Sequence, residues 1–204
     1  MRRTYRKYSN NLIRITNIYP QEMLHDINEE FDSKYNNWSF EKLESDGSYS
    51  FGELLMCSND NQYSYNNDLG WIHKFFEASI YAKHALKKYF RDPTKDYELQ
   101  RIQTNIQYYG MEAGWHVDER NQDGIYWSMV TYVNLGWDYT WDGNFCFADS
   151  DGEHYAIPPT PNSGVLFDAT CDHKGSAPNR FYDRPRKSLA YLFKEVDNNR
   201  KGRL

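Results

Sequence analysis

Short alternating segments in the second half of the chain constrain the fold more than any other sequence feature. From about residue 97 onward, runs of alternating apolar and polar residues are separated by Gly, Asp, Asn and Pro. Such alternation is typical of strands, and tight turns between strands favour antiparallel sheets. The eight runs are ELQRIQTNIQYY, GWHVD, YWSMVTYVNL, NFCFAD, HYAIPP, GVLFDA, CDHKG and KSLAYLFK. This pattern predicts a double-stranded β-helix, a cupin-like jelly roll in which two sheets face each other.

The first part of the chain adds helices, so the predicted class is mainly β with flanking helices (α+β). After a strand-like LIRITNIY, the segment QEMLHDINEEFDS follows Pro20 and carries an apolar stripe, which predicts a helix. A second helix is predicted from Trp71 to Phe90, ended by Pro93. Residues 32–69 are rich in Ser, Asn, Asp and Tyr and predict a loop, a hairpin or a lid, which we expect to face the substrate.

Length and charge limit the organisation and the partners. At 204 residues we expect a single domain, 1–204, with a helical front and lid segment at 1–96 and a jelly-roll core at 97–194. A net charge of −5 argues against nucleic-acid binding. Arg2, Arg3, Arg6 and Lys7 are expected to form a solvated terminus. No apolar run suits a signal peptide or a membrane span, so we expect a cytoplasmic protein without membrane contact.

The cysteines and the ring-bearing residues carry less information. The three cysteines are scattered and odd in number, which favours reduced thiols over a disulfide framework or a CxxC metal site: Cys57, Cys146 and Cys171. The chain has 18 Tyr and 6 Trp, whose rings suit either a binding cavity or the packing of a small β core. Neither feature selects a function.

Three residues predict a metal site. In GWHVD, His116 and Asp118 are two positions apart, so on a strand both side chains point to the same face. His173 would complete the ligand set. Two histidines and one carboxylate on one face of an octahedral ion leave the opposite positions open, as in non-haem Fe(II) oxygenases.

A cation thirteen residues after His173 extends the site. In RKSLAYLF, Arg186 and Ser188 share a face by strand alternation. A guanidinium offers a planar pair of donors for a carboxylate, and the serine adds a hydroxyl. We therefore expect a carboxylate pocket beside the metal.

From about Tyr97 to Lys194, the order and spacing of these motifs resemble the Fe(II)/2-oxoglutarate oxygenases, most closely their prolyl-4-hydroxylase-like branch. The matching pieces are YYG at 108–110, HVD at 116–118, DG at 123–124, TYVN with WD at 131–138, PNSGVLFD at 161–168, His173 and the RKS run. The resemblance implies that Tyr132 helps Arg186 bind the tail of 2-oxoglutarate. It also implies a second cosubstrate tyrosine, which would fall on Tyr108 or Tyr109.

The resemblance further implies the cofactors and the reaction. Fe(II), 2-oxoglutarate and O2, with ascorbate as an accessory reductant, would hydroxylate an unactivated C–H of a peptide or small molecule. Because Asp118 is present, hydroxylation is favoured over halogenation. Peptidyl proline, a free amino acid and a sugar all stay open as substrates.

Two other classes of protein fit part of the pattern. A zinc hydrolase could use the same three ligands, but Arg186 and Ser188 would then need another role. A non-catalytic cupin-like binding protein would use the aromatic residues without needing the complete ligand set. No feature of the sequence sets the oligomeric state.

Overall fold

The computed structural model describes residues 2–32, 39–40, 52–58, 72–120 and 123–198. Among them lie eleven strands, two α-helices and one short 3-10 helix, η1 (Tyr139–Trp141). The helices are α1 (Gln21–Phe31) and α2 (Ile72–Phe90). The strands are β1 (Thr4–Ser9), β2 (Leu12–Thr16), β3 (Ser39–Phe40), β4 (Gly52–Ser58), β5 (Lys95–Gln107), β6 (Tyr126–Tyr132), β7 (Phe145–Ala148), β8 (His154–Ile157), β9 (Ser163–Asp168), β10 (His173–Gly175) and β11 (Arg186–Asp197).

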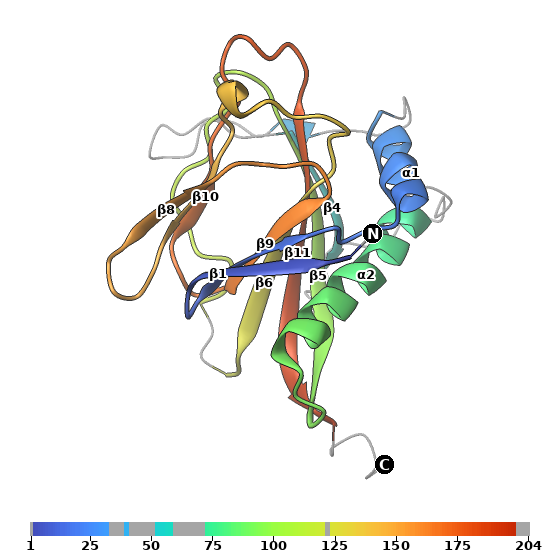
Figure 1. The fold of residues 1–204 in the computed structure, drawn as a ribbon, viewed down its shortest axis with the longest axis vertical. Coiled ribbons are helices and arrows are strands. Elements are labelled where there is room, and N and C mark those ends of the chain that lie inside the picture. The colour runs from blue at the N-terminus through green and yellow to red at the C-terminus, as the bar shows by residue number, and fades with distance from the viewer. Residues whose placement is uncertain (1, 33–38, 41–51, 59–71, 121–122, 199–204) are drawn as a thin grey trace.

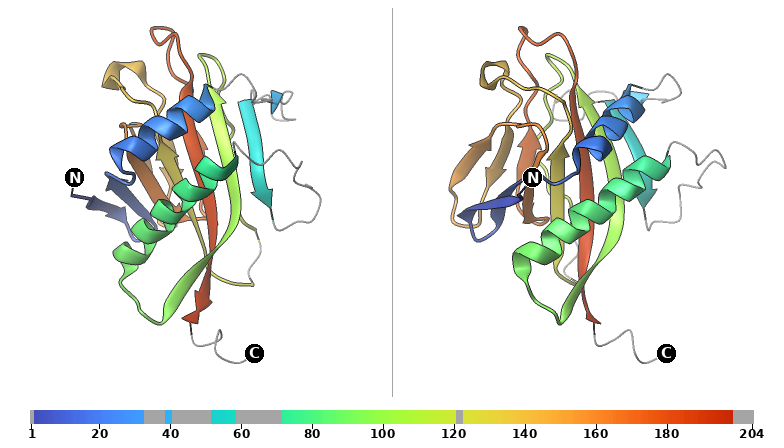
Figure 2. Two further views of the ribbon diagram at one scale, coloured as in Figure 1. Left: turned by 90° about the vertical axis from the view of Figure 1, so that its right-hand side faces the viewer. Right: turned by 45° about the vertical axis from the view of Figure 1, so that its right-hand side comes forward.

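The strands form two antiparallel sheets that face each other. The large sheet has the order β1-β2-β9-β6-β11-β5-β4-β3, and the small sheet has the order β10-β7-β8. Helices α1 and α2 lie along the outer face of the large sheet, and the small sheet lies on its inner side (Figures 1 and 2). This is the double-stranded β-helix predicted from the sequence.

Two apolar layers hold these parts together. Between the helices and the large sheet, α1 contributes Leu24, Ile27 and Phe31, which recur at helical spacing and are buried. Between the two sheets lies a second cluster that includes Phe145, Phe147 and Phe167. The strands of the large sheet therefore bury side chains on both faces, and the inner layer surrounds the space in which the predicted site residues meet.

Two elements of the N-terminal segment extend the sheet of the predicted core. β1 and β2 pair with each other, and β2 pairs with β9. The exposed Arg6 and Lys7 of the basic terminus lie on β1, a strand that the sequence did not predict. Two charged residues in a row interrupt the alternation of apolar and polar positions that marks a strand. Only the pairing with β2 therefore reveals β1.

The predicted strand GWHVD is the one clear error in the second half of the chain. His116 makes only an isolated antiparallel bridge with His173. Their backbones exchange two hydrogen bonds of 3.0 and 2.9 Å, and β10 itself is only three residues long. The ladder ends there because the chain turns just before His173, so this segment is a loop that forms a single β-bridge rather than a strand.

The predicted helices are confirmed as α1 and α2. Of the lid predicted at 32–69, only Asp32, β3 and β4 belong to the described part of the chain, and β4 pairs with β5 in the large sheet. The remainder of that prediction lies outside the described residues. Among the described residues, neither helix has the length and apolar character needed to span a membrane.

Candidate active site

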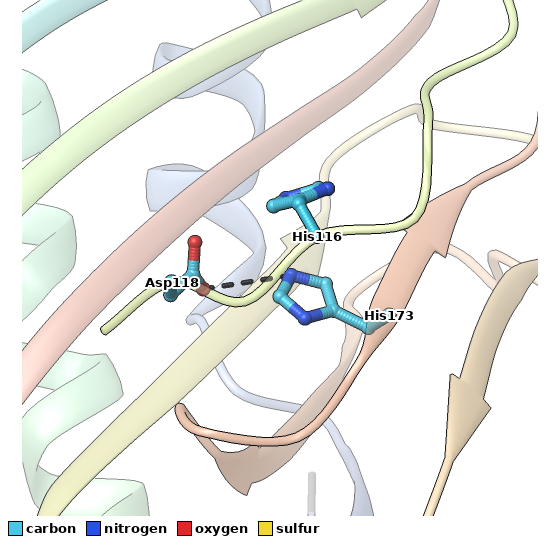
Figure 3. A group of neighbouring side chains, drawn as sticks. All are labelled: His116, Asp118 and His173. Carbon is cyan, nitrogen blue, oxygen red and sulfur yellow. Dashed lines mark ion pairs between the residues drawn. The ribbon is translucent and has the colours of Figure 1, made fainter. Parts of the chain in front are cut away.

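His116, Asp118 and His173 meet between the two sheets. Asp118 follows the bridge and donates its backbone N–H to the carbonyl of Ala169 over 3.0 Å, which fixes the loop a second time. One ligand atom from each of the three side chains lies within 4.8 Å of the others. Figure 3 shows the three side chains directed toward one another. The predicted ligand set is therefore assembled in space, with the geometry to hold one ion.

The two imidazole rings are oriented by backbone carbonyls. Nδ1 of His116 lies 2.9 Å from the carbonyl of Gly114, and Nδ1 of His173 lies 3.1 Å from that of Cys171. Because a carbonyl only accepts, each ring carries its proton on Nδ1 and leaves the lone pair of Nε2 free for a metal. Burial lowers the pKa of His173 and outweighs the opposing effect of Asp118, which favours the neutral, metal-binding form.

The carboxylate of Asp118 is held at both oxygens. Arg101 donates to Oδ1 over 2.8 Å, and the hydroxyl of Ser128 donates to Oδ2 over 2.5 Å. Oδ2 also lies 3.6 Å from Nε2 of His173. Burial raises the pKa of Asp118, but His173, Arg101 and the Ser128 hydrogen bond together outweigh burial, so its pKa is lowered. The side chain is thus kept ionised in the geometry that a hard divalent cation requires.

A cavity extends from these three residues along the inner faces of β5 and β11. In the antiparallel register, Arg186 lies opposite Gln107 and Ser188 lies opposite Asn105. Side chains of both strands line the cavity together with the metal-ligand residues; the lining is Gln103, Asn105, Gln107, Ala113, His116, Asp118, Val130, Phe145, His173, Gly175, Arg186, Ser188 and Ala190. The metal ligands and the predicted carboxylate pocket therefore share one space.

Arg186 is a buried cation without a carboxylate partner among the described residues. Only 4% of its surface is exposed. Its guanidinium donates to the side-chain carbonyl of Gln107 and, over 3.3 Å, to the backbone carbonyl of Gly143, whereas Nε has no hydrogen-bond partner. Burial lowers the pKa of Arg186. Burying a guanidinium with only neutral partners is costly, so the position is suited to an anionic ligand.

A further buried donor, the hydroxyl of Tyr132, points to the same ligand. The hydroxyl of Tyr132 has no hydrogen-bond partner, and the Tyr132 ring centroid lies 5.7 Å from Cζ of Arg186. Burial raises the pKa of Tyr132 to about 12, so the hydroxyl keeps its proton and can donate. A carboxylate beside Arg186 would satisfy the unused donors, so the residues present fit the distal end of a dicarboxylate.

Comparison with known proteins agrees with this geometry. Residues 104–194 match the family model of the 2OG-Fe(II) oxygenase superfamily. Over this segment, which carries the candidate site, the chain is a member of the superfamily. It is therefore a dioxygenase that uses Fe(II), 2-oxoglutarate and O2. No curated protein matches the chain by sequence.

Solved structures share the oxygenase fold at low sequence identity. A prolyl-4-hydroxylase from Pseudomonas putida has a TM-score of 0.62 and 17% identity, with 90% of this chain and 92% of that chain covered. A prolyl hydroxylase from Trichoplax adhaerens, in complex with a hypoxia inducible factor peptide fragment, has a TM-score of 0.61 and 14% identity, covering 95% and 87%. The α-ketoglutarate-dependent epimerase SnoN from nogalamycin biosynthesis has a TM-score of 0.65 and 10% identity, covering 92% and 78%.

In the structure, most of the site residues predicted from the sequence lie together. The second tyrosine, Tyr108 or Tyr109, does not lie with them. Ser188 lines the cavity beside Arg186, and Tyr132 lies next to the guanidinium. Tyr108 and Tyr109 are 39% and 66% exposed, and neither lines the cavity. The cosubstrate role of Tyr108 or Tyr109 therefore stays a prediction that the cavity lining does not support.

Sequence reasoning missed several polar residues of the oxygenase site. Gln103, Asn105 and Gln107 alternate along β5 and line the cavity, whereas Ile102, Thr104 and Ile106 between them are buried on the helix side. The sequence did contain a signal for these three residues, because an amide side chain at every second position is unusual in a strand with two buried faces. No sequence signal marked Arg101 or Ser128, because their contacts with Asp118 depend on how a distant loop folds back.

A larger cavity lies elsewhere, between α1, the loop that precedes η1 and the loop that leads into β11. Its walls include Glu29, Trp141 and Arg184. None of the three metal-ligand residues lines it. The size of a cavity therefore does not identify the candidate site, because the smaller cavity is the one lined by the proposed metal ligands.

Proposed function

We propose that His116, Asp118 and His173 bind the Fe(II) of this dioxygenase and that Arg186, with Tyr132 and Ser188, binds the distal carboxylate of 2-oxoglutarate. The observation that carries the proposal is the buried guanidinium of Arg186, which has no carboxylate partner among the described residues and lies in the same cavity as the metal-ligand set. A zinc hydrolase or a simple binding protein gives that buried charge no evident role.

Each residue has a defined task in this reaction. When bound, iron and 2-oxoglutarate activate O2 for C–H hydroxylation, with release of succinate and CO2. The two histidines present Nε2, because their Nδ1 protons face backbone carbonyls. Asp118 is kept ionised by Arg101 and Ser128. Arg186 fixes the far end of the cosubstrate, so its keto acid end is directed at the metal-ligand residues.

We further propose that the substrate is a prolyl residue in a peptide. The resemblance of the 108–194 motifs to the prolyl-4-hydroxylase-like branch supports this, as does the fold shared with two prolyl hydroxylases, one of them bound to a peptide fragment. A small molecule is the second candidate, favoured by the similar fold of an epimerase from nogalamycin biosynthesis.

The metal assignment is tested by removing one ligand. Under anaerobic conditions, the parent protein with Fe(II) and 2-oxoglutarate should develop a weak visible charge-transfer band, and His116→Ala should lose it. His154→Ala is the matched control, because His154 lies on β8 and packs edge-on against Trp115 rather than in the cavity. A His116→Ala protein that keeps the band and the turnover of the parent would refute the assignment. Stoichiometric zinc that supports hydrolysis would instead favour the hydrolase.

The substrate assignment is tested by succinate release with panels of proline-containing peptides, free amino acids and sugars. Mass analysis of the products should show a gain of one oxygen on a prolyl residue. If only a free amino acid or a sugar stimulates succinate release, the small-molecule alternative replaces the peptide. If no condition supports 2-oxoglutarate turnover by the iron-loaded protein, the proposed catalytic role of the site is wrong.

A further inference from the structure

Gln107 occupies a position that neither the metal set nor the carboxylate pocket accounts for. It is the last residue of β5, its side chain points into the cavity, and only 1% of its surface is exposed. Its side-chain carbonyl accepts from Nη2 of Arg186. Its amide nitrogen donates to the backbone carbonyls of Met111 and Gly175, each over 2.9 Å. Both N–H groups and the carbonyl oxygen of the Gln107 amide are therefore bonded to protein groups.

These three partners belong to the parts of the chain that carry the site. Met111 lies in the loop that leads to His116, and Gly175 lies two residues after His173 on β10. The same Gly175 carbonyl also accepts from the N–H of Ala113 over 3.3 Å. One amide thus joins both metal-ligand segments to the guanidinium.

The backbone of β10 lies directly against the end of the Arg186 side chain. A Cβ at Gly175 would lie 2.4 Å from Nη2 of Arg186, closer than any real Cβ contact. The backbone of β10 and the guanidinium are therefore packed directly against each other, with Gln107 bonded to both. Because the Gln107 carbonyl is neutral, it orients Nη2 without neutralising the positive charge that an anionic ligand needs.

We propose that Gln107 is a positioning residue that sets the distance between the metal-binding residues and Arg186, and thereby selects the chain length of the dicarboxylate that the pocket accepts. The proposal rests on the proposed function of the same site. A keto acid held at both ends must match the spacing of its two anchors. The residue that ties the anchors together therefore decides which homologue fits.

The test compares three keto diacids: 2-oxoglutarate, oxaloacetate, which is one methylene shorter, and 2-oxoadipate, which is one methylene longer. Binding of each is measured by calorimetry on anaerobic protein loaded with Fe(II), so the readout does not depend on turnover. The variants are Gln107→Ala, which removes all three hydrogen bonds, and Gln107→Asn, which keeps the amide on a shorter side chain. Gln100→Ala is the matched control, because Gln100 lies on β5 outside the cavity.

We expect the parent and Gln100→Ala to prefer 2-oxoglutarate over both homologues. In Gln107→Ala the affinity for 2-oxoglutarate should fall by about tenfold or more, the size of effect expected for losing a hydrogen bond to a charged group. The affinities for the two homologues should fall much less, so the preference narrows. Gln107→Asn should shift the preference in the same direction while Fe(II) still binds.

Equal weakening of all three acids, or an unchanged preference in both variants, would overturn the proposal and leave Gln107 with a structural role only. Failure of the parent itself to bind any of the three acids would instead contradict the proposed function. A Gln107→Ala protein that does not fold leaves Gln107→Asn to decide the matter by the same comparison.

Discussion

Asp118 is the most closely held of the three metal-ligand residues. A buried carboxylate is expensive unless it is paired and hydrogen-bonded, and here Arg101 and Ser128 each take one oxygen. Its side chain is only 13% exposed. In the metal-free protein, Arg101 is therefore the main compensation for the buried charge, and a bound cation would add a second one.

Replacing Arg101 with Met should consequently destabilise the metal-free protein more than the metal-bound protein. We expect a loss on the order of 1–3 kcal/mol in the free energy of unfolding without metal, because the Asp118 carboxylate loses a charged donor. Excess divalent metal should recover part of this loss. Denaturant unfolding of both forms measures the difference, with Arg6→Met on the exposed β1 as control. An identical loss in both forms would show that Arg101 does not act through Asp118.

Strand β11 shows how one element separates two neighbouring cations. Arg186 points into the cavity, whereas Lys187 points to the helix side, where Nζ lies 2.6 Å from Oδ1 of Asp32 and 3.2 Å from Oδ1 of Asn28. The period of two along a strand imposes this division. Arg184, in the preceding loop, lines the other cavity. Only Arg186 is therefore placed to meet a ligand beside the metal.

The two cations should respond differently to removal. Arg186→Ala should weaken 2-oxoglutarate binding by about 2–4 kcal/mol while leaving Fe(II) binding nearly intact, because it removes the charged partner of a desolvated carboxylate. Lys187→Met should leave 2-oxoglutarate affinity unchanged and lower the free energy of unfolding on the order of 1–2 kcal/mol, because the link between β11 and α1 is lost. Titration calorimetry and denaturant melts separate the two effects. An Arg184→Ala protein that shows the Arg186 phenotype would contradict the strand register.

At the scale of the whole molecule, the site lies between two sheets that pack against each other but are not hydrogen-bonded to each other as neighbouring strands. His173 belongs to β10 of the small sheet, His116 and Asp118 to a loop bonded to it at single points, and Arg186 to β11 of the large sheet. A metal held by the two histidines and Asp118, together with a keto acid that reaches Arg186, would connect the two sheets through the cavity. Ligands that bind only the folded state raise its stability by mass action.

We therefore expect Fe(II) and 2-oxoglutarate together to raise the melting temperature by about 10–20 °C at concentrations roughly 100 times their Kd. The shift with 2-oxoglutarate should depend on the metal, since the keto acid then has both anchors. Anaerobic differential scanning fluorimetry measures the four combinations of the two ligands. His173→Ala should show no metal-dependent shift. A full shift with 2-oxoglutarate alone would mean that the metal takes no part in its binding.

The sequence by itself predicted both helices, most strands of the core, and the grouping of Arg186 with the three residues proposed to bind the metal. These depend on short-range periodicity and on residue types whose chemistry is nearly unique, such as two histidines with a carboxylate. Strand alternation was also sufficient to turn Arg186 and Ser188 inward together.

Tertiary structure decided what depends on contacts between distant segments. The loop conformation of GWHVD follows from a single bridge to β10, which no local pattern encodes. Arg101 and Ser128 matter only because the loop brings Asp118 between their strands, and Gln107 matters only because Arg186, Met111 and Gly175 converge on it. A hydrogen bond needs its partner within about 3 Å, and residues far apart in sequence come that close only once the sheets have packed.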